Sequence, residues 1–265
     1  MIQLAKRLLS SAVLVSITLF TIFLAPKWFF FLMVEGFILS ALNEFLSLAE
    51  KKGIVINRAL ALFFGALLPF SFYFPSESVI LVMACLTLFI FNFHRRLREQ
   101  ALISTAVTIF GIIYVAWFFS HLTKIHYLPH GPWWVFYTIL LVKGGDAGAY
   151  FIGKTFGKIK LIEHVSPNKS IEGAIGGFLT TLILSLISKV YLPYAEMVHL
   201  VVLGSAIGIL SQFGDLAESL IKRDVGVKDS CHVPGLGGVL DVLDSLLLTV
   251  PFVYYYITVF PGIIH

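Results

Sequence analysis

The chain has 265 residues, of which 58% are hydrophobic and 13% are charged, and its formal net charge is +4. Soluble domains carry about 25% charged residues. This composition therefore excludes an ordinary soluble protein and indicates one whose apolar surface lies in a lipid bilayer. The small positive charge is spread along the chain, so we expect no nucleic-acid partner. Two cysteines, Cys85 and Cys231, are too few for a disulfide framework and are expected to be free thiols.

The first apolar run, from Leu8 to Leu24, follows Lys6 and Arg7 and has the layout of a signal peptide. We find no small-x-small cleavage site after it, and further apolar runs follow. We therefore expect this run to be a retained first helix.

Apolar runs of spanning length recur along the whole chain. A membrane-spanning helix needs about 20 mostly apolar residues. Such segments are predicted at residues 8–25, 28–49, 56–74, 78–93, 101–120, 132–153, 171–190, 197–220 and 237–260. The sequence thus predicts an all-α, polytopic integral membrane protein with about nine transmembrane helices.

The basic residues predict the orientation of these helices. If the N-terminus is cytoplasmic, 15 of the 19 lysines and arginines fall at cytoplasmic ends and loops, and Lys143 lies within a span. The opposite side then holds only Lys27, Lys124 and Lys189. The positive-inside rule requires such a bias, so we expect a cytoplasmic N-terminus and a C-terminus on the opposite side.

The two parts of the chain differ in their polar residues. Residues 1–130 are rich in Phe and Leu and are predicted to form scaffold helices that face lipid and could make an oligomer contact. Residues 131–265 are predicted to be the catalytic region, because polar residues gather at helix ends and in two cytoplasmic loops, 154–170 and 221–236. We expect a site in this region that faces the cytoplasm.

Acidic residues inside predicted spans are costly and usually functional. In the eighth span, Asp215, Glu218, Ser219 and Lys222 lie at positions i, i+3, i+4 and i+7, and so share one helix face.

In the ninth span, Asp241, Asp244 and Ser245 also share one face. Carboxylates from two facing helices can form an oxygen-rich Mg²⁺ site. The alternative is that these carboxylates only pair with nearby basic residues, but their number and grouping favour a metal.

Basic and glycine residues accompany the carboxylates. Any single lysine is explained by topology alone, but a cluster beside carboxylates suits a triphosphate and a second phosphate. The basic clusters comprise Lys154, Lys158, Lys160 and Lys169 in one predicted loop, and Lys222, Arg223 and Lys228 in the other.

The glycines have two interpretations. The pairs Gly153/Gly157 and Gly173/Gly177 have the spacing of close helix packing. In contrast, Gly235, Gly237 and Gly238 follow Pro234 and lead into the ninth span, where a helix N-terminus could cradle phosphate.

These motifs together resemble those of the phosphatidate cytidylyltransferases, which are CDP-diacylglycerol synthases. The family signature S-x-x-K-R-x4-K-D is matched from Ser219 to Asp229. The motifs P-G-H-G-G and L-D-R-x-D are matched at all but one position each, from Pro234 to Gly238 and from Leu240 to Asp244. Two further family motifs, D-T-x-A-Y-x-x-G and S-P-x-K-T-x-E-G, resemble the stretches from Asp146 to Gly153 and from Ser166 to Gly173. The resemblance covers about residues 140–250.

The resemblance implies a reaction of CTP with phosphatidic acid that gives CDP-diacylglycerol and pyrophosphate in phospholipid synthesis. It implies that Mg²⁺ is bound, and allows a second metal ion, which could be monovalent. It also implies a bacterial cytoplasmic membrane, substrate held in membrane lipid, and a homodimer by analogy. The implied catalytic residues are Asp215, Asp241, Lys222, Arg223 and Asp229, and the metal ligands are Asp215, Asp241 and Asp244. The implied substrate-binding residues are Asp146, Ser166, Lys169, Ser219, Lys228, Gly235, Gly237 and Gly238.

The sequence departs from the family pattern in three places, one of which is a stretch between Asp229 and Pro234 that is one residue shorter than usual. Leu236 stands where the family usually has His, and Val242 stands where it usually has Arg. Alternatives therefore stay open: a CTP-dependent lipid or polyprenol kinase, a cytidylyltransferase for another lipid phosphate, an inactive homologue, or an ion-coupled transporter. A transporter typically shows paired halves, whereas the polar residues here gather in one half.

Overall fold

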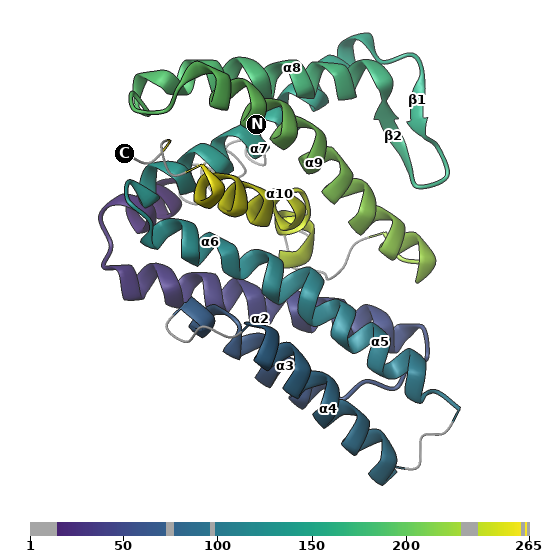
Figure 1. The fold of residues 1–265 in the computed structure, drawn as a ribbon. Helices are drawn as coiled ribbons and strands as arrows, with labels where there is room; N and C mark the ends of the chain where they lie inside the picture. The colour runs from purple at the N-terminus through teal and green to yellow at the C-terminus, as the bar shows by residue number, and fades with distance from the viewer. Residues whose placement is uncertain (1–14, 73–76, 96–98, 229–237, 261–262, 264–265) are drawn as a thin grey trace.

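The computed structural model describes residues 15–72, 77–95, 99–228, 238–260 and 263 (Figure 1). After a helix over residues 15–23, the N-terminal elements are α2 (Lys27–Lys51), α3 (Arg58–Leu67), the short helix η1 (Pro69–Phe72), α4 (Glu77–Arg95), α5 (Ala101–Gly111), η2 (Ile112–Trp117) and α6 (Phe118–Tyr127). The C-terminal elements are α7 (Gly131–Phe156), β1 (Lys160–Ile162), β2 (Ser166–Ser170), α8 (Ile171–Ile187), η3 (Ser188–Val190), α9 (Met197–Asp224) and α10 (Val239–Val259).

The described chain is almost entirely helical, as predicted for an all-α membrane protein. By length and composition, six helices of this part can cross a membrane: Lys27–Lys51, Ala101–Tyr127, Gly131–Phe156, Ile171–Val190, Met197–Asp224 and Val239–Val259. The helix at residues 15–23 and the shorter apolar helices Arg58–Ser71 and Glu77–Phe93 coincide with the other three predicted spans. The count of nine spans and the cytoplasmic N-terminus stay predictions.

Helix α10 lies at the centre of the bundle (Figure 1). It packs against α9 and α7 from the C-terminal region and against α2 and α6 from the N-terminal region. Apolar side chains such as Leu240, Leu247 and Val250 on α10 are fully buried. The helix that carries two of the predicted metal ligands is therefore supported by both parts of the chain.

The close packing of α7 against α8 depends on glycine, as the spacing predicted. A Cβ atom on Gly173 of α8 would lie 2.9 Å from the carbonyl oxygen of Ala149 and 3.0 Å from the Cα of Gly153, both on α7. Those atoms belong to backbone and cannot move aside, so a larger residue would force the two helices apart. This contact sets the distance between the helices that carry Asp146 and the hairpin.

The prediction of a loop over residues 154–170 is wrong in part. Helix α7 continues to Phe156, and β1 and β2 form an antiparallel hairpin with the pairs Lys160↔Ser170 and Ile162↔Ser166. Glu172, in the first turn of α8, accepts hydrogen bonds from the backbone N–H groups of Lys158 (3.1 Å) and Ile159 (3.3 Å). Glu172, which follows the hairpin, therefore fixes the backbone of residues 158 and 159, which precede it.

The predicted loop at residues 221–236 is also wrong at its start. Helix α9 extends to Asp224, so that Lys222 and Arg223 lie in its last turn and not in a loop. The apolar run ends near Leu220, but backbone hydrogen bonds carry the helix about one turn further. This extension keeps Lys222 on the helix face that holds Asp215 and Glu218.

Candidate functional site

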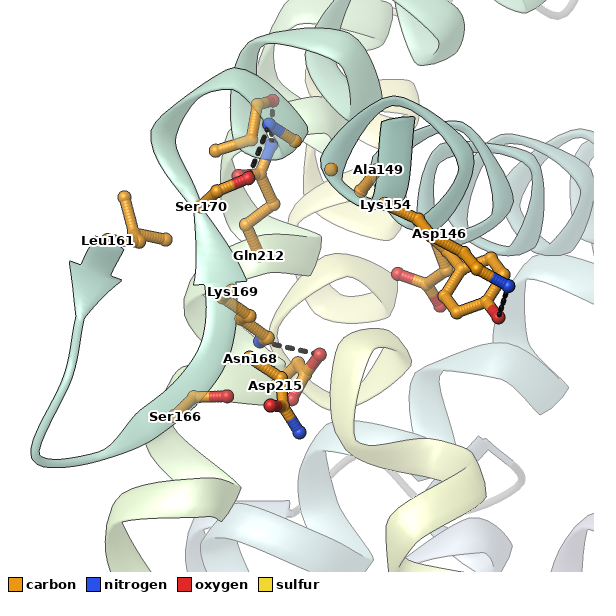
Figure 2. Close-up of a pocket in the computed structure, with 14 residues that line it drawn as sticks. Asp146, Ala149, Lys154, Leu161, Ser166, Asn168, Lys169, Ser170, Gln212 and Asp215 are labelled. Atoms are coloured by element: carbon orange, nitrogen blue, oxygen red, sulfur yellow. Dashed lines mark hydrogen bonds and ion pairs between the residues drawn. The ribbon is translucent and has the colours of Figure 1, made fainter. Parts of the chain in front are cut away.

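A pocket of about 510 Å³ lies between α7, the β1–β2 hairpin, α8 and α9 (Figure 2). Its walls combine apolar groups, among them Ala149 and Leu161, with charged ones. The polar side chains of its lining include Asp146, Ser166, Asn168, Lys169, Gln212 and Asp215. A pocket that is polar on one wall and apolar on another suits a ligand with a charged group and a hydrocarbon part.

The hairpin contributes the lysine of this pocket. Strand β2 directs Lys169 toward α9, where its Nζ lies 2.6 Å from Oδ2 of Asp215 (Figure 2). Ser219, one turn further along α9, donates a 3.4 Å hydrogen bond to Oδ1 of the same aspartate. The side chains of Lys169 and Asp215 are 26% and 33% exposed, so both remain accessible to a ligand.

A second group of side chains joins α7 to α10. Lys143 of α7 donates a 2.9 Å hydrogen bond to the carbonyl oxygen of Val242 and lies 3.5 Å from the carboxylate of Asp146. Ser245 of α10 bridges two carboxylates, because its Oγ lies 3.5 Å from Asp146 and 3.1 Å from Asp244. Val242 thus contributes through its backbone although its side chain is apolar.

Three carboxylates from three helices lie near one another: Asp146 of α7, Asp215 of α9 and Asp244 of α10. Ser245 contacts the first and the last, and Gly214, which precedes Asp215, packs against the backbone of Asp244. With Lys143 and Lys169 the three carboxylates form a group of formal charge −1. Mutual repulsion of like charges favours a cation at such a place. Among the described residues, however, no three Asp, Glu, His or Cys side chains already form a metal-binding cluster.

Asp241 belongs to a different cluster. Lys222 forms ion pairs with both Glu218 and Asp241, the latter at 2.6 Å. The Glu218 side chain is fully buried, and those of Lys222 and Asp241 are 12% and 17% exposed. The second oxygen of Asp241 accepts a 2.7 Å hydrogen bond from the backbone N–H of Gly238. In this structure Asp241 thus binds a lysine and a helix terminus.

A glycine lets the two acidic helices approach each other. A Cβ atom on Gly214 would collide with the carbonyl oxygen of Asp244 and lie 3.1 Å from the Cα of Ser245. Because Gly214 precedes Asp215, the absence of a side chain here brings Asp215 directly beside the first turns of α10.

The structure gathers the predicted site residues into two separate groups, one at the pocket and one around Lys222. Asp146, Ser166, Lys169 and Asp215 line the pocket, Ser219 contacts Asp215, and Lys222 contacts Asp241. Asp244 lies beside Asp146 and Asp215, separate from the ion pair of Asp241. The predicted residues Asp229, Gly235 and Gly237 lie outside the described residues, as do Cys231 and Leu236.

Three predicted residues have other surroundings. Arg223 is exposed and donates hydrogen bonds to the carbonyl oxygens of Val165 (3.2 Å) and Val227 (3.1 Å), so it ties the hairpin turn to the end of α9. Lys228 is exposed. Gly238 donates its N–H to Asp241, so this amide has a carboxylate partner in place of the predicted phosphate.

Sequence reasoning missed some residues of the site. Gln212 and Asn168 line the pocket, and Gln212 is fixed by hydrogen bonds from its Nε2 to the carbonyl oxygens of Ala174 (3.0 Å) and Gly208 (2.8 Å). The position of Gln212, three residues before Asp215 on the same helix face, was the signal that could have found it. Asn168 offered none beyond its place beside Lys169.

The fold and the site define a helical membrane protein with a pocket that is lined by both acidic and basic side chains. The chain matches the model of the cytidylyltransferase family over residues 5–260. This protein therefore belongs to that family.

Relatives of established name agree with this assignment. The chain is 38% identical over 154 residues to a phosphatidate cytidylyltransferase of Bacillus subtilis (56% of each chain). It is 44% identical over 133 residues to the protein of that name from Haemophilus influenzae (48% of this chain and 46% of that one). These matches span about half the length of those relatives. A phosphatidate cytidylyltransferase of Synechocystis is 29% identical over 285 residues, 95% of this chain and 96% of that one.

Proposed function

We propose that this protein transfers a cytidylyl group from CTP to phosphatidic acid, giving CDP-diacylglycerol and pyrophosphate. The observation that carries the proposal is the pocket in which Asp146, Lys169 and Asp215 meet from three different elements. The family membership and the names of the relatives support it.

The proposed reaction needs little base catalysis. The phosphate monoester of the lipid is already largely ionised near neutral pH, because its second pKa is about 6. One of its oxygens forms a bond to the α-phosphorus of CTP, and the bond from that phosphorus to the bridging oxygen of the β-phosphate breaks. Pyrophosphate leaves with the electron pair of that bond. The main barrier is the approach of two polyanions, which positive charge reduces.

Cationic and polar side chains of the pocket support the proposal. Lys169 enters the pocket from β2 and Lys154 lines it from α7, so both can bind phosphate oxygens. Ser166 and Asn168 add hydrogen-bond donors on the hairpin wall. Lys222 forms ion pairs with Glu218 and Asp241 and can bind a phosphate only after it breaks one of them. Its proposed role is to exchange one of these carboxylates for a phosphate when the ligand binds.

We further propose that Mg²⁺ binds at the carboxylates of Asp215 and Asp244, with Asp146 beside them. The donor set consists of oxygen atoms, which Mg²⁺ prefers, and the net negative charge of the group fits a cation. Asp241 would become a ligand on exchanging Lys222 for the metal. Bound Mg²⁺ would neutralise phosphate oxygens and the leaving pyrophosphate. A second metal ion and a homodimer remain proposals by family analogy.

The test uses purified protein in detergent, with CTP and phosphatidic acid, in Mg²⁺ or in EDTA. We expect CDP-diacylglycerol and pyrophosphate with Mg²⁺ and neither product with EDTA. Release of CDP with a newly phosphorylated lipid would instead identify a kinase and overturn the proposal. If the protein acts only on another lipid phosphate, the proposal of phosphatidic acid as substrate is wrong, while the proposed class of reaction stands.

A matched pair of variants on α9 tests the site. Asp215→Asn should abolish product formation and weaken binding of Mn²⁺, used as a spectroscopic probe for Mg²⁺. Asp224→Asn, on the same helix, should change neither, because Asp224 is exposed and pairs with Lys52. Equal activity of the two variants would remove Asp215 from the proposed machinery.

A further inference from the structure

A buried carboxylate of the N-terminal region contacts the helix that carries Asp241 and Asp244. Glu44 lies on α2 and is 8% exposed. Its two oxygens accept hydrogen bonds from the backbone N–H groups of Val239 and Leu240, each at 2.9 Å. Each oxygen has its own donor, so the carboxylate plane is fixed against the first turn of α10.

These two N–H groups need an external acceptor. The first amides of an α-helix have no intrahelical partner, and the helix dipole places partial positive charge there. A carboxylate satisfies both requirements at once. The preceding N–H, that of Gly238, is accepted by Asp241 at 2.7 Å. Three consecutive amides thus end on two carboxylates, one from α2 and one from α10 itself.

The contact determines where α10 places its carboxylates. Asp241 is in the first turn and Asp244 is one turn further, so a rotation or shift of this turn moves both. Lys222 holds Asp241 from the α9 side at 2.6 Å, while Glu44 holds the backbone from the α2 side. The first turn of α10 is therefore fixed from two opposite helices.

We propose that Glu44 is a positioning residue of the site: its carboxylate holds the first turn of α10 so that Asp241 and Asp244 face α9 and α7. The kinetic part of this inference rests on the proposed function, while the structural part does not. Glu44 does not line the pocket, so it acts through α10 and not on the substrate.

The structural part is tested by hydrogen–deuterium exchange of the full chain in detergent. The variant is Glu44→Gln, whose amide can accept only one of the two N–H groups. The matched control is Glu35→Gln, the same change on the same helix, at a carboxylate that makes no hydrogen bond within the described structure. We expect at least one of the amides of Val239 and Leu240 to exchange faster in the first variant, and both to exchange at the wild-type rate in the control. Equal protection in all three proteins would overturn the inference.

The kinetic part compares kcat with KM for CTP in the same three proteins. Substitution of groups that orient active-site ligands typically costs about 10- to 100-fold. We expect Glu44→Gln to lower kcat by about that factor and to leave KM for CTP within about twofold, because the pocket itself is unchanged. Glu35→Gln should have wild-type values of both.

The outcomes separate the two proposals. A wild-type protein without turnover would refute the proposed function, and the exchange measurement would then decide the role of Glu44. An active wild type with an equally active Glu44→Gln variant would overturn the positioning role. A fall in kcat that follows only from a loss of folded protein, measured by thermal unfolding, would also overturn it.

Discussion

Replacement of Lys222 by Met should strongly destabilise the protein, because this lysine is shared by two carboxylates in a buried place. Glu218 is fully buried, and the side chains of Lys222 and Asp241 are 12% and 17% exposed. Counted with both carboxylates ionised, the formal charge of the three groups changes from −1 to −2 when the lysine is removed. Removal of one partner from a buried ion pair costs about 3–5 kcal/mol, since the remaining charge stays buried without compensation. We therefore expect Lys222→Met to lower the free energy of unfolding by about 3 kcal/mol or more.

A control and a rescue sharpen this prediction. Lys52→Met removes the lysine of an exposed ion pair, in which the side chains of Lys52 and Asp224 are 44% and 61% exposed. It should cost at most about 1 kcal/mol. Adding Glu218→Gln to Lys222→Met removes the uncompensated buried charge, so the double variant should recover most of the loss. A double-mutant cycle then gives the coupling between the two side chains.

The assay is equilibrium unfolding in mixed detergent micelles, followed by tryptophan fluorescence. A Lys222→Met variant within about 1 kcal/mol of wild type would refute the reasoning, because it would mean that Glu218 is not held as a buried charge. The same conclusion would follow if the double variant were less stable than the single one.

Three further predictions concern neighbouring groups. Gly214→Ala should lower unfolding stability by about 1–3 kcal/mol and reduce turnover, since its Cβ collides with the backbone of Asp244; wild-type values in both assays would contradict this packing. Tyr114→Phe should leave the free energy of unfolding unchanged or raise it by up to about 1 kcal/mol, because the buried hydroxyl has no hydrogen-bond partner among the described residues. A clear loss of stability in thermal unfolding would contradict this and indicate a hydrogen-bond partner. Asp241→Asn should abolish CDP-diacylglycerol formation while the unfolding curve still shows a folded protein, and retained turnover would remove Asp241 from the site.

The membrane helices could be predicted because a helix that crosses the bilayer needs a run of about 20 mostly apolar residues, and such runs are visible in the sequence. The ends of the helices could not be predicted, because a helix can continue beyond its apolar segment. Helix α9, for example, continues through Lys222 and Arg223 to Asp224. The hairpin that carries Lys169 was missed because its five-residue strand Ser166–Ser170 has a polar sequence with no alternating apolar pattern.

The shared helix faces of the site were predictable from spacing, but the partners across the fold were not. Helical periodicity placed Asp215 and Lys222 on one face, and the structure keeps them there. The pairing of Lys169 with Asp215 and of Lys222 with Asp241 depends on how separate elements pack. Glu44 is the clearest case, because it contacts residues 195 and 196 positions away and lies in the region predicted to be scaffold.

The central place of α10 has a consequence for how the protein is made. Chains fold during synthesis from the N-terminus onward, and α10 follows in the sequence all four helices against which it packs, α2, α6, α7 and α9. The contacts of those helices with α10 can therefore form only after the last of the five has been synthesised. The hydrogen bonds that Glu44 accepts from Val239 and Leu240 and the ion pair of Lys222 with Asp241 are among these late contacts, whereas Lys222 and Glu218 can already pair within α9.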